Sequence, residues 1–80
     1  MKKVSHANAV YLNSEALKMI NYDKDRNVLE AMFTNGSIYQ YLDVPESIWE
    51  DFLTVIHSGK SAGTFINTAI KPFFKYTEIT

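Results

Sequence analysis

The sequence predicts an α+β domain in which two helices pack on one face of a three- or four-stranded antiparallel meander. Apolar residues alternate with polar ones on both sides of Asn35-Gly36, a dipeptide that strongly favours a two-strand hairpin. After position 44 the apolar residues recur every three or four positions, which is typical of amphipathic helices. The 80 residues contain no internal repeat, so we expect a single domain over residues 14–80.

Residues 1–13 carry a weaker pattern than the rest of the chain. Few sizeable apolar side chains occur there, and they are scattered among polar ones, so we expect an N-terminal arm or an extra strand, with a short helix as another option. The basic start is not followed by a long apolar run, which argues against a signal peptide and a membrane span. We therefore expect a cytoplasmic protein that does not enter a membrane.

The central meander is predicted to consist of three strands that are joined by two turns. The β-rich segment 19–22 runs into the polar stretch 23–27, which is rich in turn formers. Residues 28–34 and 37–43 then form the two arms of the hairpin around Asn35-Gly36. A further short strand, or a tail packed on the core, is expected at residues 73–79, where β-formers are concentrated.

Two registers of the hairpin compete, and they place Tyr39 and Tyr41 on different faces. A two-residue loop puts both tyrosines beside the even-numbered residues of 28–32. A three-residue loop, with Gly36 left-handed, puts them beside the odd-numbered residues of 29–33. The second register separates polar from apolar side chains better, because Glu30 and Gln40 then lie opposite each other on the other face. We favour it, which makes the tyrosines mostly core with their hydroxyls at a polar edge.

Both helices are bounded by recognisable start and stop residues. Pro45 suits a first helical turn, and Gly59 suits the end of that helix. Ser61 is a candidate N-cap for the second helix, which Pro72 ends. The apolar positions of the two helices are Ile48, Trp49, Phe52, Val55 and Ile56, then Phe65, Ile66, Ala69 and Ile70. Trp49 lies beside the apolar stripe, and periodicity favours a core position over a rim position.

No catalytic, cofactor or metal site is predicted. Gly59-Lys60-Ser61 resembles the end of a phosphate-binding loop, but that motif requires a glycine where Thr54 stands. His57 and Ser58 are neighbours in a helix and so do not face each other, which excludes a nucleophile and base pair. Neither His57 nor His6 has a second ligand at a spacing typical of metal sites, and the chain has no Cys.

Aromatic and basic residues are the remaining candidates for function. Tyrosine and phenylalanine rings stack on unpaired bases, and lysine contacts phosphates. The formal net charge of −1 provides no global attraction for nucleic acid, so any such binding must come from a local patch. The lysines of the C-terminal third make that part mildly basic.

The order of short motifs along the chain resembles the KTSC domain family, named for its occurrence at the C-terminus of some lysyl-tRNA synthetases. The resemblance runs from Ser14 to about Tyr76 and departs at two positions, Asn21 for a usual Gly and Pro72 after Lys71. The motifs are Ser14 with Ile20-Asn21-Tyr22-Asp23, Leu29-x-Ala31-x-Phe33, Asn35-Gly36, Tyr39-x-Tyr41, Val44-Pro45, Ser61-x-Gly63-x-Phe65-x-Asn67 and Ile70-Lys71.

The resemblance implies a non-catalytic binding module in a family of unassigned function, in which RNA binding is suspected from the synthetase connection. The alternative is a protein-interaction or self-associating accessory domain. For RNA binding, the surface that we predict combines the start and end of the second helix with nearby rings. Its residues are Lys60, Ser61, Gly63, Asn67, Lys71, Tyr41 and Tyr76.

Overall fold

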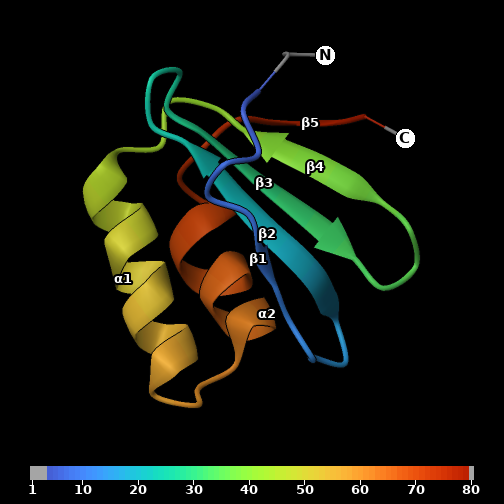
Figure 1. Ribbon diagram of the computed structural model, residues 1–80. Coiled ribbons are helices and arrows are strands. Elements are labelled where there is room, and N and C mark those ends of the chain that lie inside the picture. Colours follow the sequence, from blue (N-terminus) through green and yellow to red (C-terminus); the bar gives the residue numbers. More distant parts are fainter. Residues whose placement is uncertain (1–3, 80) are drawn as a thin grey trace.

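Five antiparallel strands form one sheet in the order β1-β2-β3-β4-β5 in the computed structural model, which describes residues 4–79 (Figure 1). The strands are β1 (Val10–Tyr11), β2 (Leu17–Asp23), β3 (Val28–Phe33), β4 (Ile38–Tyr41) and β5 (Tyr76–Glu78). The prediction of three or four strands is therefore too low. The two additional strands are the shortest, with two and three residues, and their pairing depends on neighbours more than on their own pattern.

Both helices lie on the same side of the sheet, as predicted (Figure 1). They connect β4 to β5 and consist of α1 (Glu46–His57), α2 (Ala62–Phe65) and the π-helical segment η1 (Ile66–Ile70), which continues α2 without a break. The Ser61 hydroxyl accepts a hydrogen bond from the Thr64 N–H at 3.2 Å, so the predicted N-cap is confirmed.

The N-terminal arm predicted over residues 1–13 includes the edge strand β1, which pairs with β2. Residues 4–9 precede β1 and belong to none of the strands. Residues 1–3 lie outside the described part of the chain. The structure therefore combines an arm and an extra strand in the region where the sequence left both open.

The β3–β4 hairpin has the register with the three-residue loop. Leu29 lies opposite Tyr41 and Ala31 opposite Tyr39, and the Phe33 N–H donates to the Ser37 carbonyl at 2.8 Å. Gly36 has a φ of 94°, a left-handed conformation that glycine adopts without steric cost. Tyr39 and Tyr41 therefore lie on the face that the helices cover.

A bulge in β2 corrects the alternation of its side chains. Strict alternation would place Leu17 on the same face as Met19, away from the helices. The register shifts between these two residues, so Lys18 is an extra residue and Leu17 joins Ile20 on the helix-covered face. The bulge thereby adds a fully buried leucine to the core.

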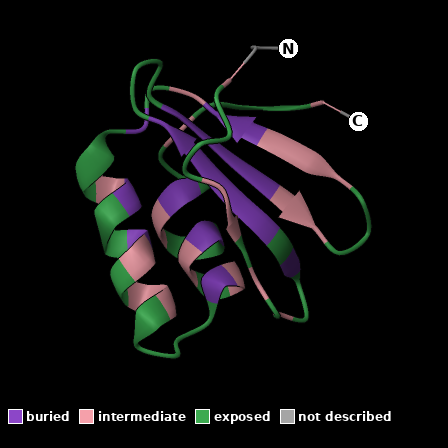
Figure 2. Cartoon of the chain, in the orientation of Figure 1, coloured by how far each residue is buried: buried purple, intermediate pink, exposed green. Residues whose placement is uncertain are grey.

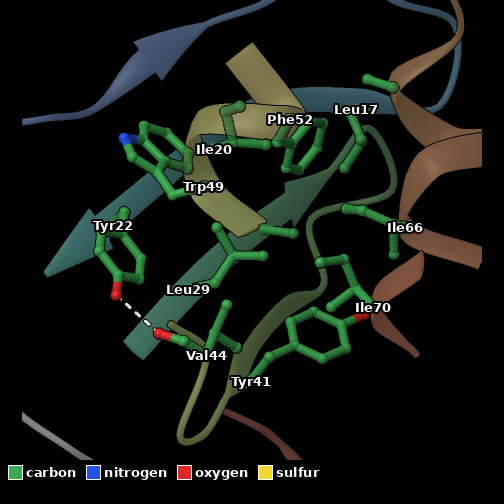
Figure 3. Close-up of a cluster of buried hydrophobic side chains, with 12 residues drawn as sticks. Leu17, Ile20, Tyr22, Leu29, Tyr41, Val44, Trp49, Phe52, Ile66 and Ile70 are labelled. Carbon is green, nitrogen blue, oxygen red and sulfur yellow. Dashed lines mark hydrogen bonds between the residues drawn. The ribbon is translucent and has the colours of Figure 1, made fainter. Parts of the chain in front are cut away.

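The core fills the space between the helices and the sheet, where Figure 2 shows the buried positions. Trp49 is buried and stacks on Tyr22 with ring centroids 5.6 Å apart, so its predicted core position is confirmed. The Tyr22 hydroxyl donates to the carbonyl of Val44 at 2.6 Å (Figure 3). This bond connects the C-terminal end of β2 to the segment that leads into α1.

A second set of hydrogen bonds orders the turn between β2 and β3. The Asp23 carboxylate accepts from the backbone N–H groups of Asp25 and Arg26 at 3.0 and 3.2 Å, and from Arg26 Nη1 at 2.9 Å. It also accepts from the Ser5 N–H at 2.9 Å. The Ser5 N–H, followed by the Arg26 guanidinium and the turn N–H groups, holds the pKa of Asp23 below its ordinary value of 3.8.

Replacing Tyr22 by Phe should destabilise the fold by about 1–3 kcal/mol, because the buried Val44 carbonyl loses its donor. Urea denaturation of both proteins measures this difference. Tyr11→Phe is the matched control, since Tyr11 is 81% exposed and its hydroxyl should matter by less than about 0.5 kcal/mol. Equal losses for the two variants would contradict the assigned role of the Tyr22 hydroxyl.

Acid should remove the stabilisation that Asp23 provides. Because the pKa of Asp23 is lower in the folded chain, the unfolded chain binds this proton first as the pH falls, and the stabilisation is complete above about pH 5. We expect Asp23→Asn to be less stable than the parent near neutral pH, and the gap to close as the pH falls below about 4. Urea midpoints measured across this range test the expectation, with Asp25→Asn as a control for charge in the same turn. A gap that is constant with pH contradicts it.

Candidate functional site

An aromatic cluster lies at the β3–β4–β5 end of the helix-covered face. Tyr39 and Tyr41 are two positions apart on β4 and therefore share a face, and the antiparallel pairing of β4 with β5 places Tyr76 opposite Tyr41. The Tyr76 ring lies 5.5 Å from that of Tyr41 and 5.7 Å from that of Tyr39, while Phe33 meets Tyr39 edge to face at 5.5 Å. The four rings form one continuous aromatic wall.

The wall borders a hollow of about 240 Å³, which we call the aromatic hollow. Asn67 and Lys71 line its other side and reach it from η1 and the residue that follows η1. The two side chains are four positions apart and so project from adjacent turns of the helix. Its complete lining is Phe33, Asn35, Ser37, Tyr39, Tyr41, Asn67, Lys71 and Tyr76.

The π-helical segment affects how this side of the hollow is built. The Lys71 N–H donates to the carbonyl of Ile66, five residues earlier, at 2.8 Å. Ile66 and Ile70 are buried in the core, while Asn67 and Lys71 are exposed. The wider turn thus holds two isoleucines inward and two polar side chains toward the rings, and such segments occur frequently at functional sites.

Four of the seven predicted site residues meet in the aromatic hollow, namely Tyr41, Asn67, Lys71 and Tyr76. The other three do not reach it. Lys60 and Ser61 lie in the connection between α1 and α2 and line two separate, shallow hollows. Their participation in a binding surface stays a prediction.

Ser61 has a clear structural role, and Gly63 packs near the segment that precedes β2. The Ser61 hydroxyl caps α2, and a Cβ added at Gly63 would lie 3.5 Å from the Cβ of Ala16, an ordinary contact distance. Gly63 is partly buried against the segment that precedes β2. Neither residue directs a free polar side chain toward the aromatic hollow.

The sequence prediction omitted four residues of the hollow: Phe33, Asn35, Ser37 and Tyr39. All four belong to the hairpin, which the sequence suggested mainly as scaffold. Their proximity to Tyr41 follows from the three-residue loop register, so the register was the signal that could have identified them. Their proximity to Asn67 and Lys71 depends on how the second helix packs, which no local pattern indicates.

Two tyrosines of the hollow, Tyr39 and Tyr41, have raised pKa values. Burial, assisted by the nearby Tyr39 and Tyr76 hydroxyls, raises the pKa of Tyr41 to about 12. The Glu78 carboxylate, followed by burial, raises the pKa of Tyr39. At neutral pH both phenols therefore keep their protons; the Tyr39 hydroxyl is hydrogen-bonded to Glu78, and both can act as hydrogen-bond donors. Together with the Lys71 ammonium and two amides, they suit a planar ligand that carries a negative charge.

Within residues 4–79, no three histidine, cysteine, aspartate or glutamate side chains gather as metal ligands. No helix in that range is long and apolar enough to cross a bilayer.

Several known proteins are similar to this chain. A KTSC domain protein from Yersinia pestis has a crystal structure that superposes with a TM-score of 0.77 at 32% identity, covering 91% of this chain and 97% of that one. A protein of Tsukamurella paurometabola is 33% identical over 64 residues, which is 80% of this chain and 90% of the relative. A lysine–tRNA ligase of Nostoc punctiforme is 31% identical over 64 residues, but these make up only 11% of that ligase.

A model of the KTSC domain matches residues 13–76. These residues include four of the five strands in whole or in part, both helices and every residue that lines the aromatic hollow. The motifs that suggested this family therefore lie within the matched region. The chain belongs to the KTSC domain family.

Proposed function

We propose that this chain is a non-catalytic cytoplasmic module that binds unpaired RNA by taking a base into the aromatic hollow. The observation that carries the proposal is the placement of the Tyr76 ring, 46% exposed, in one hollow with the Asn67 amide and the Lys71 ammonium. These three groups can stack on a base, bond its edge and pair with its phosphate.

The arrangement suits single-stranded RNA better than a duplex. The hollow accepts a planar group from outside, and a base inside a duplex is not available for insertion. Asn35 and Asn67 carry amides that can both donate and accept, as the edge of an unpaired base requires. With a net charge of −1 the chain has no field that would attract a long polyanion, so we expect contacts to few phosphates.

The lysine–tRNA ligase relative supports RNA as the ligand. The matching segment makes up 11% of that protein, which is named as a ligase of lysine and tRNA. The relatives of Tsukamurella paurometabola and Stutzerimonas stutzeri match this chain over 90% and 94% of their own length, so the domain also occurs without such a host. We infer that the domain binds RNA on its own.

A protein-interaction or self-associating role is the second candidate. Two large apolar side chains outside the aromatic hollow are strongly exposed, Tyr11 at 81% and Phe73 at 72%. The edge strand β5 is exposed along all three residues, and an exposed edge can pair with a further strand. A constant molecular mass across a wide concentration range would argue against self-association.

Replacing Tyr76 by Ala should weaken RNA binding by about 1–3 kcal/mol, because a stacking ring is lost. Fluorescence anisotropy of a labelled single-stranded oligonucleotide at low salt measures the affinity. Tyr11→Ala removes a ring that lies outside the hollow and is more exposed, at 81% against 46%, and it should leave the affinity unchanged. Absence of binding by the parent protein, or equal losses for both variants, contradicts the proposal.

The dependence of binding on salt should identify the phosphate contact. Lys71→Ala should reduce the slope of log affinity against log salt concentration by about 0.7, the value for one phosphate of a single strand. Lys24→Ala removes an exposed lysine outside the hollow and should keep the slope of the parent. A slope that Lys71→Ala leaves unchanged excludes Lys71 as a phosphate ligand.

A further inference from the structure

A row of buried polar side chains crosses the face of the sheet opposite the helices. Asn21 on β2 lies opposite Glu30 on β3, which in turn lies opposite Gln40 on β4. Each is at most 3% exposed. The Glu30 carboxylate accepts from Asn21 Nδ2 at 3.2 Å and from Gln40 Nε2 at 3.0 Å. This polar row is separate from the aromatic hollow, because its residues alternate with those that face the helices.

Residues 4–9 lie against the polar row and hold it through specific contacts. His6 Nε2 is 2.8 Å from Glu30 Oε1. The Ser5 N–H donates to Asp23 at 2.9 Å, and the Ser5 carbonyl accepts from Asn21 Nδ2 at 3.0 Å. The backbone of one residue and the side chain of the next are thus recognised together. The sheet therefore binds this segment in the way that it would bind a separate peptide.

Residues 4–9 are anchored by polar contacts, which also include a hydrogen bond from Asn8 Nδ2 to the Tyr22 carbonyl at 3.1 Å. Residues 5–8 are all exposed, and the segment forms no strand pairing with the sheet before β1. The His6 side chain is itself 57% exposed, whereas that of Glu30 is 4% exposed. An exposed segment held by a few polar contacts opens at low free-energy cost. It can therefore be exchanged for another peptide without unfolding the core.

With His6 in place, one buried hydrogen-bond acceptor of the polar row has no donor in the range 4–79. Asn21 Oδ1 is buried and accepts no hydrogen bond within the described residues. An unsatisfied buried acceptor is costly, and the imidazole offers one N–H to the carboxylate. Asn21 Oδ1 and the Glu30 carboxylate belong to neighbouring side chains of the polar row, since Asn21 Nδ2 donates to Glu30. A guanidinium carries five N–H donors in a planar fork and can serve both acceptors at once.

We propose that the polar row is a binding site for an arginine side chain of a partner protein, and that His6 occupies this site until the partner displaces residues 4–9. The partner segment presents an arginine directly after a residue whose N–H and carbonyl replace those of Ser5. Glu30 pairs with the guanidinium, Asn21 Oδ1 accepts from it, and Asp23 binds the partner backbone. This partner site is independent of the RNA site in the aromatic hollow.

The test uses the full chain labelled with ¹⁵N and a blocked peptide, acetyl-Gly-Ser-Arg-Gly-amide. The side-chain amide resonances of Asn21 and Gln40 report directly on Glu30, because both groups donate to it. His6→Ala removes the competing imidazole from Glu30 and leaves the Ser5 contacts in place, so we expect saturable shifts of these resonances and tighter binding than to the parent. The same peptide with citrulline for arginine should bind about tenfold more weakly, because it keeps the shape and loses the charge.

Two further variants separate the outcomes. Adding Glu30→Gln to His6→Ala should abolish the shifts. If that double variant does not fold, the comparison of the arginine and citrulline peptides on the parent protein remains decisive. Tyr76→Ala should bind the peptide as the parent does, so failure of RNA binding leaves this test intact. Equal binding of the two peptides, or no shifts of Asn21 and Gln40 in folded His6→Ala, overturns the proposal.

Discussion

The pairing of β3 with β4 determines what each face of the sheet presents. With Gly36 left-handed and Phe33 bonded to Ser37, the tyrosines of β4 share a face with Leu29 and Ala31. Glu30 and Gln40 are thereby directed together to the opposite face. A shift by one residue would reverse both faces, exposing the rings and burying the carboxylate against the helices. The aromatic hollow and the polar row both depend on this register.

The two faces are then completed by segments distant in sequence. On one face, η1 packs two isoleucines into the core and brings Asn67 and Lys71 to the aromatic wall. On the other, residues 4–9 cover the polar row through the contact of His6 Nε2 with the Glu30 carboxylate. The hairpin supplies the stable half of each site, and a later or earlier segment supplies the other half. Because the helix is anchored by buried side chains and the N-terminal segment by polar contacts, only the second is readily exchanged.

Burial has opposite consequences on the two faces. In the aromatic hollow it raises the pKa of Tyr41 and keeps the phenol as a neutral donor beside Lys71. At the polar row it surrounds the carboxylate of Glu30 with two amides and His6, since a buried charge requires partners. One face is thus suited to an anionic planar group and the other to a cation. The two proposed recognition surfaces of this chain therefore differ in the charge that they favour.

The sequence by itself determined the class of fold, the hairpin, both helix starts and the core position of Trp49, because these depend on local spacing and turn chemistry. It also indicated the favoured register through the separation of polar from apolar residues. It did not determine the short edge strands β1 and β5, whose pairing is set by neighbours rather than by their two or three residues. Nor could it assign Lys60 and Lys71 to different surfaces or place His6 on Glu30. Those relations join residues far apart in the chain, and only the packing of helix and arm on the sheet decides them.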